Sequence, residues 1–63
     1  MNFNLRELRE SKHMTQAELA EKSGISRYSI IKLETGKSEY IRSSTAVKLA
    51  EALGISPKEF FFG

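Results

Sequence analysis

Cysteine is absent from this chain of 63 residues, and His13 is its single histidine. Without cysteine there is no disulfide framework and no thiolate metal site, and one histidine alone does not make a metal site. A chain this short buries only about 60% of its unfolded surface, so packing alone has to hold a small core. We therefore expect no metal, no cofactor and no large catalytic cleft.

Long apolar runs are absent as well. The longest uninterrupted run is the three phenylalanines at 60–62, far below the roughly 18 residues that a membrane-spanning helix needs. The N-terminus has no apolar signal segment, and the serines have no neighbouring base that would support nucleophilic catalysis. We expect a soluble protein of cytoplasmic character that is not an enzyme, with no membrane partner and no small-molecule substrate.

The excess positive charge is confined to one segment. The formal net charge is +2, and residues 1–23 and 43–63 each carry as many cations as acids. In residues 24–42 the cations outnumber the acids by four to two, the cations being Arg27, Lys32, Lys37 and Arg42 and the acids Glu34 and Glu39. A local positive field favours a polyanionic partner, although charge alone is equally compatible with an ordinary solvated surface.

Two helix starts carry a full capping signature, in which an oxygen-bearing residue is followed three positions later by Glu. Thr15 with Glu18 is the first, and Ser56 with Glu59 is the second, with Pro57 at the favoured first helical position. These pairs predict helices that begin near residues 15 and 57.

Two further starts are less complete. Asn4 with Glu7 fits a looser version, with Asn2 as an equal alternative for the cap. Ser26 is followed by Ser29 where the pattern has Glu, so only half of the signature is present. We still expect a helix after each of these residues.

Glycines predict where the helices end. Gly24, Gly36 and Gly54 close helices expected over roughly 15–23, 27–35 and 44–53. The last of these has an apolar stripe with helical spacing, made of Ala46, Leu49, Ala50 and Leu53.

No strand-like alternation, internal repeat or linker is present in the sequence. The chain is therefore predicted to be one all-α domain of five helices over residues 1–63, alone or as the N-terminal part of a longer protein. Within the longest connection, residues 37–43, Tyr40 and Ile41 are expected to fold back onto the core or a partner.

The connection "SGIS", residues 23–26, is too short for the following helix to run back antiparallel, which is typical of a helix-turn-helix. An advance of 100° per residue directs Ile30 and Leu33 inward and Tyr28 outward, with Ile31 and Lys32 beside it. Arg27 lies at the boundary. Cationic and hydroxyl groups on such a face can donate to guanine or phosphate, and an apolar side chain can meet a thymine methyl.

The run "MTQAELAEKSGISRYSIIKLETGK", residues 14–37, resembles the helix-turn-helix of phage Cro and repressor proteins and the related xenobiotic-response-element-type regulators. The matching features are Thr15-Gln16, Leu19-Ala20, Gly24, Ile25-Ser26, Ile30, Leu33-Glu34 and Gly36. Residues 49–61, "LAEALGISPKEFF", are similar to the closing helices of that family. The resemblance implies a five-helix lambda-repressor-like domain that binds double-stranded DNA and regulates transcription.

The resemblance also implies roles for individual residues. Gln16 would contact phosphate or support a base-reading side chain. Residues 26–35 would be the recognition helix in the major groove, and Arg9 would pair with Glu34 to tie the first helix to it. Contacts to base edges or the flanking backbone are implied for Ser26, Arg27, Tyr28 and Lys32, and contacts to phosphate for Lys37 and Arg42. Ile31 is a candidate for a thymine methyl. The loop 38–43 departs from the family pattern because it lacks the usual proline.

Other interpretations remain open for these residues. The cations could only solubilise a surface helix, Tyr28 could pack over the turn, Ile31 could be a tolerated exposed residue, and Gln16 could be a good helix opener. We expect two copies on DNA half-sites about 34 Å apart. The alternative functions on the same fold are a protein-interaction module that uses Tyr28, Ile31 and Tyr40-Ile41, and an antitoxin-type regulator that does both.

Overall fold

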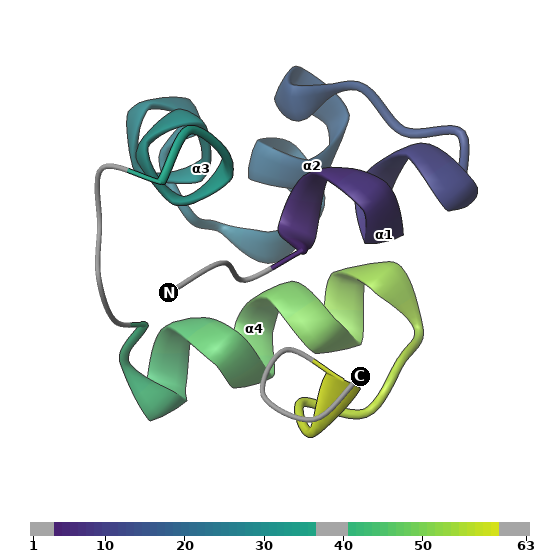
Figure 1. The fold of residues 1–63 in the computed structure, drawn as a ribbon, viewed down its shortest axis with the longest axis vertical. Coiled ribbons are helices and arrows are strands. Elements are labelled where there is room, and N and C mark those ends of the chain that lie inside the picture. The colour runs from purple at the N-terminus through teal and green to yellow at the C-terminus, as the bar shows by residue number, and fades with distance from the viewer. Residues whose placement is uncertain (1–3, 37–40, 60–63) are drawn as a thin grey trace.

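The computed structural model describes residues 4–36 and 41–59, and in these ranges the chain forms four α-helices and no strand. They are α1 (Leu5–Ser11), α2 (Gln16–Ser23), α3 (Arg27–Glu34) and α4 (Ser43–Leu53) (Figure 1). The predicted all-α class is confirmed, and the three helices expected over 15–23, 27–35 and 44–53 are present to within one residue at each end. The count of five helices is not confirmed, because the segment expected after Pro57 runs into residues outside the described ranges.

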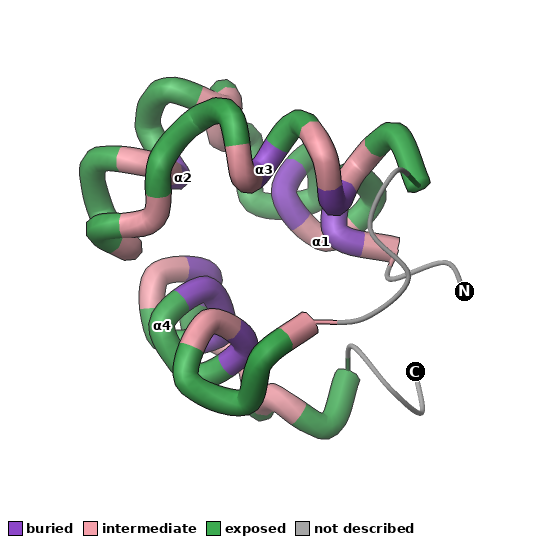
Figure 2. Tube along the Cα trace, turned by 90° about the vertical axis from the view of Figure 1, so that its left-hand side faces the viewer, coloured by how far each residue is buried: buried purple, intermediate pink, exposed green. Residues whose placement is uncertain are grey.

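Helix α4 forms one side of the fold, and the other three helices lie on the opposite side of the core (Figure 1). The predicted stripe of α4 is buried as expected, with Leu49 and Ala50 fully excluded from solvent. It packs against Leu5 of α1, Leu19 of α2 and Ile30 of α3 in one apolar cluster. In Figure 2 the buried part of α4 faces the other helices. The core therefore fixes which sides of α2 and α3 remain available to a partner.

The capping box predicted at the start of α2 is confirmed. The backbone N–H of Glu18 donates to Thr15 Oγ1 at 3.1 Å, and the Thr15 N–H donates to Glu18 Oε1 at 2.9 Å. The second of these bonds lowers the pKa of Glu18. The box is therefore intact at neutral pH and weakens as the pH falls through this lowered pKa.

The capping box considered at the start of α1 is not formed by Asn4. Asn4 occupies the N-cap position with φ 43° and ψ 25°, and its side chain makes no cap hydrogen bond. A capping side chain reaches the first free N–H groups from an extended backbone, and the left-handed backbone of Asn4 directs its side chain elsewhere. The alternative cap, Asn2, lies outside the described residues.

The connection before α4 also differs slightly from expectation. The helix begins at Ser43, and its N-cap is Arg42, whose side chain makes no cap hydrogen bond. Ile41 packs against the core cluster, as expected, whereas Tyr40 lies outside the described residues. None of the described helices is both long enough and apolar enough to cross a membrane.

Candidate nucleic-acid interface

The turn between α2 and α3 depends on the backbone conformation of Gly24. This glycine has φ 75°, a left-handed value that side-chain-bearing residues rarely adopt, and its N–H donates to Ala20 O at 2.9 Å. The Ile25 N–H donates to Ser23 Oγ at 3.1 Å. Ser26 ends the turn as the N-cap of α3. The chain thus changes direction within three residues, and α3 is seen nearly end-on in Figure 1.

Helix α3 has a buried side and a free side. Ile30 and Leu33 are 0% and 6% exposed, because both lie on the stripe that meets α1, α2 and α4. On the outer side, Tyr28 is 70% exposed and Ile31 is 36% exposed, and Arg27 is exposed beside them. The outer side therefore presents aromatic, aliphatic and cationic groups together.

The cations of this surface differ in their surroundings. Arg27 is exposed and makes no ion pair within the described residues. Lys32 is partly buried, with its Nζ 5.4 Å from the centroid of the Tyr28 ring. Arg42 is exposed at the start of α4, and Lys37 lies outside the described residues. The part of the chain that is described thus supplies three of the four predicted cations.

The side chain of Ser26 is already engaged inside the protein. Its Oγ accepts from the Ser29 N–H at 3.2 Å and donates to Ser29 Oγ at 2.9 Å. These bonds stabilise the first turn of α3. One lone pair of the hydroxyl remains free, so Ser26 is available to a nucleic acid as an acceptor.

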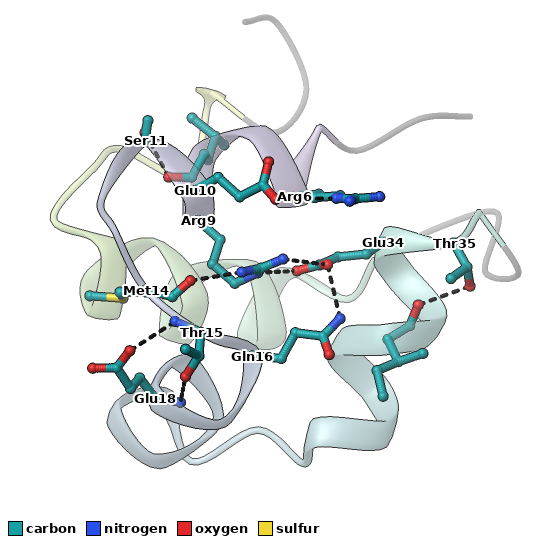
Figure 3. Close-up of polar contacts among 12 residues, drawn as sticks. Arg6, Arg9, Glu10, Ser11, Met14, Thr15, Gln16, Glu18, Glu34 and Thr35 are labelled. Carbon is teal, nitrogen blue, oxygen red and sulfur yellow. Dashed lines mark hydrogen bonds and ion pairs between the residues drawn. The ribbon is translucent and has the colours of Figure 1, made fainter.

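Arg9 and Glu34 form a two-bond pair between α1 and α3 (Figure 3). Arg9 Nε lies 2.7 Å from Glu34 Oε2, and Arg9 Nη2 donates to Glu34 Oε1 at 3.1 Å. The two side chains are only 11% and 3% exposed. Arg9 Nη1 also donates to the backbone oxygen of Met14 at 2.7 Å. The hydrogen bond to Glu34 raises the pKa of Arg9, which further favours the charged form of a guanidinium.

Gln16 extends this pair to the first residue of α2. Its Nε2 donates to Glu34 Oε1 at 3.1 Å, and in Figure 3 it reaches from α2 towards the carboxylate at the end of α3. One carboxylate therefore links three helices. The bond uses one of the two amide hydrogens of Gln16 and leaves the other hydrogen and the amide oxygen free.

The structure thus brings together on the outer side of α3 most of the residues singled out in the sequence, and it places Gln16 next to the Arg9 and Glu34 pair. Sequence reasoning missed the Met14 carbonyl as a partner of Arg9 and the bond between Gln16 and Glu34. The latter joins residues 18 positions apart, so no local pattern signals it. The contact of Lys32 with Tyr28 was missed too, although the four-residue spacing within a helix was a usable signal.

Comparison with known proteins shows which family has this arrangement of helices. A helix-turn-helix family profile matches residues 5–60. The crystal structure of the restriction-modification controller protein C.AhdI from Aeromonas hydrophila is similar with a TM-score of 0.85 and 38% sequence identity, over 95% of this chain and 89% of that one. A search of curated proteins found no match. The matched profile spans all four described helices, including the turn at Gly24 and the free side of α3, so this chain belongs to the helix-turn-helix family of Cro and repressor type and is a DNA-binding transcriptional regulator.

Proposed function

We propose that α3 enters the major groove of double-stranded DNA and selects a sequence with the side chains on its outer side. The observation that supports this most is the free face of α3, where Tyr28 is 70% exposed while Ile30, two residues on, is fully buried. Arg27 at the first helical position is the side chain best suited to a guanine, whose O6 and N7 accept two hydrogen bonds from a guanidinium. Ile31 is suited to a thymine methyl.

The flanking groups are proposed to hold the DNA backbone. Gln16 has a free amide hydrogen at the N-terminal end of α2, where backbone N–H groups also favour an anion. Arg42, exposed at the start of α4, would bind a second phosphate. Lys37 is assigned a phosphate from the resemblance to Cro and repressor proteins, and its place in the cationic segment agrees with that role. Such contacts fix the register of a protein on the duplex, whereas base contacts give specificity.

We further propose that two copies bind together as a homodimer. One α3 spans only eight residues, so a single copy contacts few base pairs. Helix-turn-helix dimers place their recognition helices one DNA turn apart, roughly 34 Å. The expected target is therefore a pair of inverted half-sites whose centres are about ten base pairs apart.

Selection of bound duplexes from a random pool tests this proposal. We expect an enriched motif with two inverted halves for the wild-type protein. Arg27→Ala should weaken binding to that motif by about 1 to 3 kcal/mol and lose the preference at one base pair in each half. Arg6→Ala is the matched control, because Arg6 is exposed on α1 and pairs with Glu10. An enriched motif that Arg27→Ala leaves unchanged would reject the role of Arg27, and no motif at low salt would reject sequence-specific binding.

A protein-interaction module is the second candidate, because the outer side of α3 includes two exposed apolar side chains, Tyr28 and Ile31. Salt separates the two functions. Affinity for DNA should fall with a log-log slope of about −0.9 for each phosphate neutralised, whereas an apolar partner site responds little to salt. A retained protein complex with a flat salt dependence would favour this candidate.

The similarity to a restriction-modification controller suggests the class of regulated genes. We propose that this chain controls genes of a restriction-modification system. Mapping of its bound sites on the DNA of its own source organism provides the test. Sites in front of genes for a DNA methyltransferase or a restriction endonuclease are expected, and sites only in front of unrelated genes would contradict this target class.

A further inference from the structure

The aromatic ring of Tyr28 and the ammonium of Lys32 lie together on the outer side of α3. Lys32 Nζ is 5.4 Å from the ring centroid, and the two residues are one helical turn apart. The ring is not drawn into the core, since Tyr28 is 70% exposed. The contact is therefore formed on the surface that faces the proposed partner.

No acidic side chain among the described residues pairs with Lys32. The acid nearest to it along α3 is Glu34, and both oxygens of that carboxylate are bonded by Arg9, with Gln16 as a further donor. Among the described residues, the Tyr28 ring is thus the group that contacts the ammonium. Its face is negative, and it attracts a cation within about 6 Å of the centroid.

The contact with the ring holds the Lys32 ammonium towards the N-terminal end of α3. Side chains on a helix lean towards its N-terminus, and the ring lies in the first turn of α3, so the ammonium is held towards the start of the helix. In helix-turn-helix proteins the start of the recognition helix contacts the base edges. A long lysine side chain loses rotamer freedom when it binds, and attraction to the ring in the free protein reduces the freedom that remains to be lost.

We propose that Tyr28 is a positioning residue that holds Lys32 for contact with the O6 and N7 acceptors of one guanine, so that the two side chains determine specificity as a unit. This inference rests on the proposed function of α3. It assigns the base contact to the ammonium and a supporting role to the ring, and the phenol hydroxyl is not needed for it.

A double-mutant cycle measured on the selected duplex at fixed salt tests the proposal. The variants are Lys32→Met, Tyr28→Leu and their combination, with Tyr28→Phe as the control that keeps the ring. Lys32→Met should weaken binding more in the wild-type background than in the Tyr28→Leu background, by about two- to fivefold. Tyr28→Leu should also relax the preference at the guanine that Lys32→Met relaxes, whereas Tyr28→Phe should keep it.

The proposal is overturned if Lys32→Met lowers DNA affinity by the same factor in both backgrounds. In that case α3 still reads DNA, but the ring does not assist.

A measurement on the free protein, without DNA, tests the contact between the ring and the ammonium independently. The ring current should shift the Lys32 side-chain methylene signals in the wild type and in Tyr28→Phe, and the shift should disappear in Tyr28→Leu. Unshifted signals in the wild type also overturn the pairing. Shifted signals in a protein that selects no duplex would reject both the base contact and the proposed function.

Discussion

Replacing Arg9 with alanine is expected to lower the free energy of unfolding by about 3 to 5 kcal/mol, as for one-sided removal of a buried ion pair. The Glu34 side chain is 3% exposed, so the variant leaves a carboxylate out of water with Gln16 as its remaining side-chain donor among the described residues. The Met14 carbonyl loses its guanidinium donor as well. In a domain of this size each kcal/mol corresponds to roughly 4 to 8 °C in Tm. Thermal unfolding followed by circular dichroism should therefore show a fall of at least about 12 °C.

Arg6→Ala is the matched control for this prediction. Arg6 lies on the same helix and pairs with Glu10 at 3.4 Å, but the two side chains are 68% and 55% exposed. Exposed pairs contribute at most about 1 kcal/mol. Equal Tm values for the two variants would show that the Arg9 pair does not stabilise the fold. Combining Arg9→Met with Glu34→Leu should recover part of the loss, because no unpaired charge is then buried.

Truncation of two neighbouring isoleucines on α3 is expected to lower the stability of the fold by very different amounts. Ile30 is fully buried, so Ile30→Ala removes packed atoms, leaves a cavity and should cost about 2 to 5 kcal/mol of stability. Ile31 is 36% exposed, so Ile31→Ala should cost less than about 1 kcal/mol. Urea unfolding measures both values.

DNA binding should rank the same two variants in reverse. At a temperature where both are folded, Ile30→Ala should keep the base preference of the wild type, because its side chain does not reach the outer side of α3. Ile31→Ala should lose preference for a thymine, because the Ile31 side chain is proposed to contact the thymine methyl group. Equal destabilisation by the two substitutions would mean that α3 is rotated about its axis, so that Ile30 is not the more deeply buried of the two.

Much of the helical architecture was predictable because it depends on local chemistry. The box of Thr15 and Glu18 involves residues three positions apart, and the glycines at 24 and 54 end helices with their own positive φ values. The stripe of α4 follows from its helical period alone. The Asn4 cap was predicted less well, since a residue of the right type needs an extended backbone to cap a helix, and Asn4 has a left-handed one.

The sequence predicted which residues make up the candidate site better than it predicted the contacts between them. The sequence by itself determined that the cations cluster in residues 24–42 and that one side of α3 carries cationic, aromatic and aliphatic groups away from the core, because charge and helical period are properties of neighbouring residues. The family resemblance implied the pair of Arg9 and Glu34, but only the tertiary structure decided that Gln16 joins this pair through the same carboxylate. Only the tertiary structure decided, too, that Tyr28 stays free of the core while it contacts Lys32. The physical reason is that burial and long-range hydrogen bonds depend on how α1, α2 and α4 pack around α3, which no segment of the chain specifies alone.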